Sequence, residues 1–98
     1  MSDLFKSQLV DRKPIRLEKN GKTICVTRVG DEVFAIDDTC SHSDASLSEG
    51  DVTGTKVECW LHGAEFDLRT GQVLSLPATI AVKTYQVKVE NDLVTIEV

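Results

Sequence analysis

Apolar and polar residues alternate in short segments of this chain, most clearly near its C-terminus. In Ile80–Glu90, positions 85, 87 and 89 are apolar and the positions between them are polar, and a second apolar segment follows at Leu93–Val98. A period of two places successive side chains on opposite faces of a strand. The pattern therefore predicts two C-terminal β-strands that reverse direction at Asn91-Asp92.

Turn residues predict further strand pairs upstream. Asn20-Gly21 separates the segments Ile15–Leu17 and Thr23–Thr27, and this dipeptide is a strong signal for a tight hairpin. Gly30-Asp31 joins the second segment to an apolar strand at Val33–Ile36. Short strands at this spacing predict an antiparallel all-β sandwich or barrel. Two more reversals are marked by Gly54-Thr55 and Thr70-Gly71.

The composition is that of one small domain covering residues 1–98. Of its 98 residues 41% are hydrophobic and only 5% are aromatic, so Val, Leu and Ile must supply most of the core. No segment approaches the roughly 20 apolar residues of a membrane helix, and nothing at the N-terminus resembles a signal peptide. We therefore expect a soluble cytoplasmic protein. Residues 2–12 have some helical character, which the pattern leaves undecided.

The negative charge is concentrated in the middle of the chain. The net charge is −5, but residues 37–67 hold eight carboxylates and one lysine, a net of −7, whereas the remainder holds eight acids and ten bases, a net of +2. The acidic region is either a solvated face or a docking surface for a basic partner. Nucleic acid is disfavoured as a partner because no basic patch is available to neutralise phosphates.

The candidate chemistry lies in two short motifs within this acidic region. Cys40-Ser41-His42 is followed, after sixteen residues, by Cys59-Trp60-Leu61-His62, and the two motifs use both histidines and two of the three cysteines. Each motif follows a predicted strand, so a rigid scaffold can hold two loop tips face to face. The third cysteine, Cys25, lies in a predicted strand, where we expect a small buried residue.

Two thiolates and two imidazoles suit two kinds of metal site. A tetrahedral Cys₂His₂ zinc would be structural, and a catalytic zinc is disfavoured because four protein ligands leave no open position. The alternative is a [2Fe–2S] cluster in which two histidines replace two cysteines on one iron. Each loop here supplies one cysteine and one histidine, which suits a two-metal group with the cysteines on the inner iron and the histidines on the outer one.

Cys40-x-His42 and Cys59-x-x-His62-Gly63 resemble the ligand signature of the Rieske iron–sulfur proteins. The resemblance covers roughly residues 30–98 and includes three further segments: residues 33–40, residues 47–50 and residues 65–71. It implies an all-β Rieske fold, an antiparallel β-sandwich with a cluster-binding subdomain of two loops, near residues 38–46 and 59–67. It also implies one [2Fe–2S] cluster bound by Cys40, His42, Cys59 and His62.

Departures from the respiratory-chain Rieske pattern point to a low-potential protein. Ala45 and Leu61 occupy positions that carry a disulfide in that group, and Ala64 and Phe66 occupy positions of a serine and a tyrosine that donate to the cluster. Hydrogen bonds to the sulfurs favour the reduced, more negative cluster. Without them we expect a potential near the low end of the Rieske range, roughly −150 mV.

A short chain of this type resembles the Rieske ferredoxin component of bacterial multicomponent ring-hydroxylating dioxygenases, which act in aromatic hydrocarbon catabolism. The resemblance implies a non-catalytic carrier that moves one electron at a time from an NAD(P)H-dependent flavin reductase to a terminal oxygenase. We expect a monomer, with no membrane partner. Trp60 is either loop packing or an apolar contact for a redox partner. Asp44 and Glu65 are expected beside it around the two histidines, and Pro77, in a proline loop at about residues 75–79, would cover one side of the cluster.

Two other functions remain open from the sequence. The chain also resembles the Rieske-type small subunit of another reductase, such as assimilatory nitrite reductase. It could also be a structural Cys₂His₂ zinc module that acts as an interaction domain. A catalytic oxygenase subunit is excluded, because no mononuclear iron site can be built once both histidines are used. The sequence does not indicate which substrate a partner oxygenase would oxidise.

Overall fold

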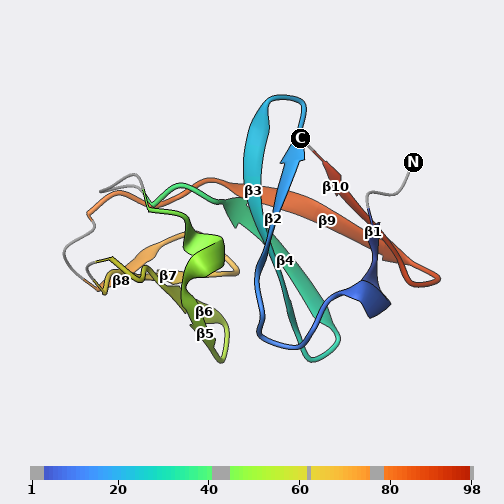
Figure 1. Cartoon of the computed structure of the whole chain (residues 1–98), viewed down its shortest axis with the longest axis horizontal. Coiled ribbons are helices and arrows are strands. Elements are labelled where there is room, and N and C mark those ends of the chain that lie inside the picture. The colour runs from blue at the N-terminus through green and yellow to red at the C-terminus, as the bar shows by residue number, and fades with distance from the viewer. Residues whose placement is uncertain (1–3, 41–44, 62, 76–78, 98) are drawn as a thin grey trace.

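The structure, a computed structural model, is almost entirely β (Figure 1). It describes residues 4–40, 45–61, 63–75 and 79–97. Within these ranges every pairing between two named strands is antiparallel. The only helical elements in the described part are two short 3₁₀ turns, η1 (Lys6–Gln8) and η2 (Leu47–Glu49), and neither could span a membrane. The predicted all-β class is confirmed.

The strands form two sheets of unequal size. The larger sheet has the order β1-β10-β9-β4-β3-β2 and the smaller one has the order β5-β6-β7-β8. The strands of the larger sheet are β1 (Leu4–Phe5), β2 (Ile15–Lys19), β3 (Lys22–Val29), β4 (Glu32–Asp37), β9 (Thr84–Glu90) and β10 (Leu93–Glu97). The strands of the smaller sheet are β5 (Asp51–Thr53), β6 (Lys56–Glu58), β7 (Glu65–Asp67) and β8 (Val73–Ser75).

Both predicted hairpins form, and their turns explain the residues found there. The β2–β3 turn places Asn20 and Gly21 at φ of 51° and 77°, and the β9–β10 turn places Asn91 and Asp92 at 49° and 69°. Two consecutive left-handed residues match the twist of a hairpin, and Asn, Asp and Gly adopt that conformation at the least cost. The N-terminal segment, left undecided by its pattern, forms β1 and η1.

The strand predicted from Ile80 begins later, at Thr84. The backbone ahead of it bonds to neighbours outside the β9–β10 ladder: the Val82 N–H donates to the Gly71 carbonyl at 2.9 Å, and the Lys83 carbonyl accepts from Asp37 at 2.8 Å. Ile80 itself is exposed. The alternation of side chains was therefore a poor guide to the start of the strand, because the pairing of residues 82–83 is decided by segments distant in sequence.

The central hairpin β3–β4 is buried on both faces and separates two cores. On β3, Ile24 and Val26 belong to one core while Cys25 belongs to the other, and on β4 Ala35 and Ile36 divide in the same way. The first core is closed by β9, β10 and the segment after η1: Leu9, Ile24, Val26, Ala35, Tyr85, Val94 and Ile96. The second core joins the hairpin to the smaller sheet and its loops: Cys25, Ile36, Cys40, Ala45, Leu47, Val57, Cys59, Ala64, Phe66, Leu68 and Val82.

The first core explains how the larger sheet is folded. β4 and β9 share only two register pairs, Ala35 with Tyr85 and Ile36 with Thr84. Beyond this short contact β9 and β10 cross the β2–β3–β4 unit, as Figure 1 shows. Side chains from both halves then meet in the first core. The sheet is therefore bent over its own apolar face, which gives the sandwich-like arrangement expected from the sequence.

The turn at Gly71 ties the smaller sheet to the segment that leads into β9. Its N–H donates to the Asp67 carbonyl at 2.7 Å, and its carbonyl accepts from Val82 at 2.9 Å. Gly71 has a φ of +76°, and a Cβ there would lie 2.1 Å from the Val82 carbonyl oxygen. Glycine is required here for two reasons, because the backbone is left-handed and another chain segment is too close for any side chain.

We expect Gly71→Ala to destabilise the protein strongly, by roughly 3–4 kcal/mol, because the Val82 backbone must move away. Gly54→Ala is the matched control, since Gly54 also has a positive φ, +59°, but nothing lies within 4 Å of a Cβ. That variant should lose only the left-handed penalty, roughly 1–2 kcal/mol. Chemical unfolding measures the loss of unfolding free energy in both variants, provided that the dependence on denaturant concentration keeps the same slope. Equal losses in the two variants would contradict the close approach at Gly71.

Candidate metal centre

Cys40 lies where the chain leaves β4 and enters the first ligand loop, defined here as residues 38–46. It is 2% exposed, and its N–H donates to the Ala45 carbonyl at 3.0 Å. An isolated antiparallel bridge between Thr39 and Ser46 joins the two limbs of the loop. The backbone therefore closes the loop directly beneath its tip, and the Cys40 side chain is turned into the second core.

Cys59 lies in an equivalent turn after β6, in the second ligand loop, residues 59–67. It is fully buried, and its N–H donates to the carbonyl of Ala64 at 2.7 Å. The span is again five residues and the acceptor is again an alanine. A further bond runs from the Gly63 N–H to the Cys59 carbonyl at 3.0 Å. The two loops thus present their cysteines by the same local closure.

The structure brings the two cysteines together in one apolar environment. Cys40 and Cys59 both belong to the second core, and neither forms a disulfide. Buried residues of several other elements share this core with them, among them Ile36, Leu47 and Val57. Two sulfur donors on separate loops of one core fit the thiolate side of a bridged iron–sulfur group, in which cysteines are the buried ligands.

His42 and His62 lie outside the described residues, as do Asp44 and Pro77. Their predicted places around the site therefore stay predictions. Among the described residues no three of Cys, His, Asp and Glu are grouped as a metal site. The described part of the chain contains the two candidate sulfur donors, Cys40 and Cys59, and the backbone that holds them.

Cys25 also lies in the second core, but its surroundings keep it a thiol. It is fully buried on β3, as predicted, and burial raises the pKa of its thiol to about 12. A weak contact of 3.7 Å to the Thr27 hydroxyl acts in the opposite direction and is outweighed. Because the thiolate is the form that binds metals, Cys25 is a packing residue rather than a ligand.

The second ligand loop is tied to β8 by Ser75, which the sequence did not single out. The Ser75 hydroxyl accepts a hydrogen bond from the Glu65 N–H at 3.0 Å and donates to the Gly63 carbonyl at 3.4 Å. The sequence predicts Ser75 only as the first residue of the proline loop, whereas the structure makes it the last residue of β8. Only the pairing of β7 with β8 places its hydroxyl against the loop.

The end of β4 is held by a hydrogen bond from β9. The Tyr85 hydroxyl donates to Asp37 Oδ1 at 2.5 Å, just ahead of the first ligand loop. Burial of the phenol, followed by this hydrogen bond and the negative charge of Asp37, raises the pKa of Tyr85 to about 12. The bond therefore fixes the point at which the chain passes from the larger sheet into the loop.

The surface near the second ligand loop carries exposed apolar side chains. Trp60 is 55% exposed and its neighbour Leu61 is also exposed, so the exposed alternative for Trp60 holds rather than loop packing. Two more exposed apolar residues, Leu74 and Ile80, lie on β8 and on the segment before β9. Single exposed apolar residues are ordinary, but a tryptophan is costly to expose and is favoured at protein interfaces.

Carboxylates are paired across the strands of the smaller sheet. Asp51 lies opposite Glu58, and Glu58 lies opposite Glu65, so three acids form a row over β5, β6 and β7. Like charges directly opposite one another destabilise a sheet. Lys56 relieves part of the repulsion through an ion pair of 3.0 Å with Glu65. The acidic surface inferred from composition is therefore real, although Asp38, counted with it, is buried.

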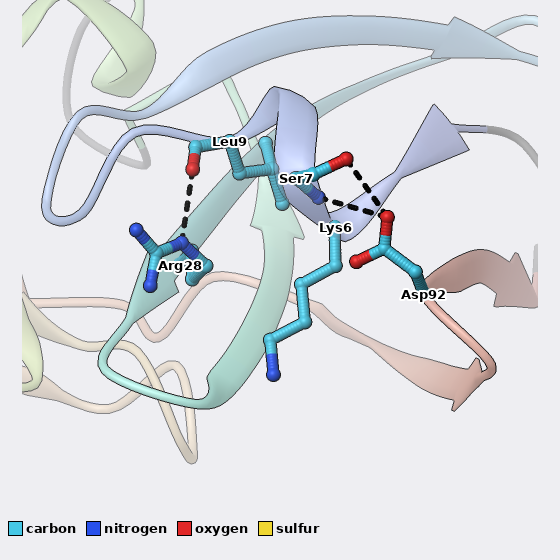
Figure 2. A pocket seen from close by; sticks show the side chains of 5 residues that line it. All are labelled: Lys6, Ser7, Leu9, Arg28 and Asp92. Carbon is cyan, nitrogen blue, oxygen red and sulfur yellow. Dashed lines mark hydrogen bonds between the residues drawn. The ribbon is translucent and has the colours of Figure 1, made fainter.

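The hollow in Figure 2 lies far from the ligand loops, where η1 meets the β9–β10 turn. Its polar groups already bond to one another. The Ser7 hydroxyl donates to Asp92 at 2.8 Å, and the Arg28 Nε donates to the Leu9 carbonyl at 2.9 Å. Lys6 forms an ion pair of 3.6 Å with Asp31. These contacts anchor the N-terminal segment and do not form a second site.

Comparisons with known proteins agree with this centre. The family model described as the Rieske [2Fe-2S] domain matches residues 2–86. The chain is 46% identical to the ferredoxin component of biphenyl 2,3-dioxygenase from Rhodococcus jostii over 83 residues. This match covers 85% of this chain and 78% of that protein.

The ferredoxin of carbazole 1,9a-dioxygenase from Nocardioides aromaticivorans superimposes on this chain with a TM-score of 0.95 at 33% identity. The superposition covers 98% of this chain and 94% of that ferredoxin.

A third similar structure is a protein from the complex of reduced oxygenase and oxidized ferredoxin in carbazole 1,9a-dioxygenase. It matches with a TM-score of 0.93 and 34% identity, covering 99% of this chain and 100% of that one. The match covers nearly the whole of this chain, so it extends over both sheets.

We expect the Tyr85 phenol to titrate near pH 12 in the folded protein rather than near its usual 10. Because the pKa is raised on folding, this group stabilises the protein fully below about pH 10, and the contribution is lost as pH rises through 12. Tyr85 is the only tyrosine, so the ultraviolet absorbance of tyrosinate reports it alone.

Tyr85→Phe is the companion variant. It should cost roughly 1–2 kcal/mol of unfolding free energy at neutral pH, and the difference from the unsubstituted protein should shrink between pH 10 and 12. A tyrosinate midpoint near 10 would contradict both the burial of the phenol and its bond to Asp37.

Proposed function

The chain belongs to the Rieske [2Fe–2S] family, and we propose that it is an electron-carrying ferredoxin of a multicomponent dioxygenase. As a member of that family it carries one Rieske-type [2Fe–2S] cluster. The proposal assigns it no catalytic step of its own: it takes one electron at a time from an NAD(P)H-dependent flavin reductase and delivers it to a terminal oxygenase. The observation that carries the proposal is the pair of buried cysteines, Cys40 and Cys59, presented by two equivalent turns in one core.

The proposed ligands are Cys40, His42, Cys59 and His62. When bound, the cluster supplies a centre that accepts and releases a single electron. The chain's own part is to position and insulate it. Cys40 and Cys59 hold their sulfurs in a core from which water is excluded, and the backbone closures that end at Ala45 and Ala64 fix their positions. Little rearrangement is then needed when the charge changes.

The apolar packing next to the cysteines supports a low potential. Ala64 and Phe66 are fully buried and carry no hydroxyl that could donate to a cluster sulfur. Hydrogen bonds of that kind raise the potential of iron–sulfur sites, and the acidic residues near the loops oppose the addition of an electron. Both effects favour a potential at the lower end of the Rieske range, roughly −150 mV.

The proposed partners are a terminal oxygenase and a flavin-dependent reductase. A ferredoxin similar to this chain over its whole length is found in complex with its oxygenase. The exposed Trp60 beside the buried Cys59 provides an apolar contact, and the carboxylates of the smaller sheet provide a negative rim. Such a surface suits brief encounters with a basic partner. We place the carrier in the cytoplasm, where cysteines that form no disulfide persist.

The alternatives are less well supported. Similarity to ferredoxin components of biphenyl and carbazole dioxygenases favours this function over that of a small subunit of nitrite reductase. A structural zinc module does not account for a match to the Rieske model over residues 2–86.

The purified protein should be reddish-brown and should give the paramagnetic signal of a reduced Rieske cluster after dithionite treatment. Cys40→Ser and Cys59→Ser should each abolish the visible absorbance, because each removes a thiolate ligand. Cys25→Ala is the matched control and should keep the full spectrum, since Cys25 is a packing thiol. A colourless protein that contains one zinc would overturn the proposal.

Electron transfer to a cognate oxygenase should slow as salt is added, because charge attraction is screened beyond about 10 Å near 0.1 M salt. Glu58→Gln should weaken this salt dependence, whereas Asp31→Asn, which neutralises a fully exposed acid in the β3–β4 turn, should not. Stopped-flow oxidation of the reduced ferredoxin measures both slopes. A rate independent of salt would remove the acidic docking surface.

A further inference from the structure

We propose that Asp38 is a positioning residue of the first ligand loop and that its buried negative charge lowers the reduction potential of the site. This inference rests on the proposed function, because it concerns the centre that the loop holds. Asp38 lies two residues before Cys40 and is 2% exposed. It is the only buried carboxylate in the described part of the chain.

The Asp38 side chain joins the two limbs of the loop. Its Oδ1 accepts the Ser48 N–H at 2.8 Å, and its Oδ2 accepts the hydroxyl of Ser46. Both donors come from the returning limb, beyond the loop tip. Ser46 is further held by a 2.8 Å contact with the hydroxyl of Ser48. Side-chain bonds of Asp38 thus close the loop from below, beneath the backbone bridge between Thr39 and Ser46.

The main chain of Asp38 strengthens the same closure. Its carbonyl accepts from the Leu47 N–H at 2.6 Å, and its N–H donates to the Thr23 carbonyl on β3 at 3.0 Å. The residue therefore connects the loop, η2 and the central hairpin. Four hydrogen bonds through one residue leave little freedom for Cys40, two positions further on.

A carboxylate is an expensive choice for this place. Burying a charge costs several kcal/mol unless hydrogen bonds and counter-charges offset it. Arg16 supplies a counter-charge at the limit of an ion pair: its Nε lies 4.0 Å from Oδ2, and its side chain is mostly exposed. A neutral asparagine would avoid the charge but offers only one acceptor oxygen for two donors. The two hydrogen-bond donors explain part of the preference for a carboxylate at this position. The negative charge has a further effect, on the reduction potential.

The field of Asp38 reaches the core that contains both ligand cysteines. After burial, its negative charge is the other cause that raises the pKa of the Cys25 thiol in that core. A charge felt at Cys25 also acts on an electron added nearby, because the low-dielectric interior screens it weakly. The effect opposes reduction and so lowers the potential.

The test compares four variants of the cluster-bearing protein by reduction potential and by the rate at which visible absorbance is lost on heating. Asp38→Asn removes the charge and one acceptor. Asp38→Glu keeps the charge but moves the oxygens. Ser46→Ala keeps the charge and removes one donor. Asp31→Asn is the control for an equal change of charge at a fully exposed position remote from the loop, before β4.

Asp38→Asn should raise the potential more than Asp31→Asn does and should speed the loss of absorbance. Ser46→Ala should speed the loss roughly tenfold, while its potential stays closer to that of the unsubstituted protein. The Asp38→Glu protein should also lose its visible absorbance faster but keep the low reduction potential. The comparison separates the effect of the charge on the potential from the effect of the hydrogen bonds on the loop.

Equal potentials in Asp38→Asn and Asp31→Asn would overturn the electrostatic role, and unchanged bleaching in Ser46→Ala would overturn the positioning role. If Asp38→Asn does not fold, the comparison of Asp38→Glu with Ser46→Ala still decides the positioning role, and a raised potential in Asp38→Glu would contradict the role of the charge. If the unsubstituted protein lacks the Rieske signal, the proposed function itself fails, which is a distinct result.

Discussion

The burial of the β3–β4 hairpin on both faces is the constraint on which the rest of the structure depends. Because successive residues of β3 point into different cores, one strand pair serves as the wall of both. One core closes the larger sheet on itself, and the other holds the smaller sheet and the two ligand loops. Cys40 and Cys59 therefore pack against a hairpin that is buried on both faces, although each is carried by a loop.

The two cysteines are held by the same local hydrogen bond, but the two loops are tied to the rest of the molecule by different residues. Cys40 and Cys59 each bond to an alanine carbonyl five residues further on, which gives the two sulfurs equivalent settings. The first loop is then held by the buried Asp38 and the second by the hydroxyl of Ser75. This division of labour suits an electron carrier, since a centre held rigidly on both sides reorganises little when its charge changes.

The surface of the smaller sheet and of the second ligand loop, unlike the interior, carries like charges and an exposed aromatic side chain. Trp60 is exposed, and a row of carboxylates across three short strands places like charges opposite one another, which destabilises the smaller sheet. Such a cost is understandable on a carrier that, as proposed, meets two partners in turn and leaves both quickly. The stabilising interactions lie inside, between the hairpin and the loops, and the proposed recognition features lie outside.

The sequence by itself determined the all-β class and the two tight hairpins, because turn dipeptides act over a few residues. Its Cys/His spacing also predicts the two ligand pairs of the proposed cluster. It also placed Cys25 in the core. It could not show that β9 begins at Thr84, that Asp38 is buried or that Ser75 holds a loop. Each of these depends on partners from distant strands: Gly71 and Asp37 beside residues 82–83, the returning limb of the loop around Asp38, and β7 beside Ser75. Local pattern specifies which segments become strands, whereas only the packed chain decides which polar groups it must bury.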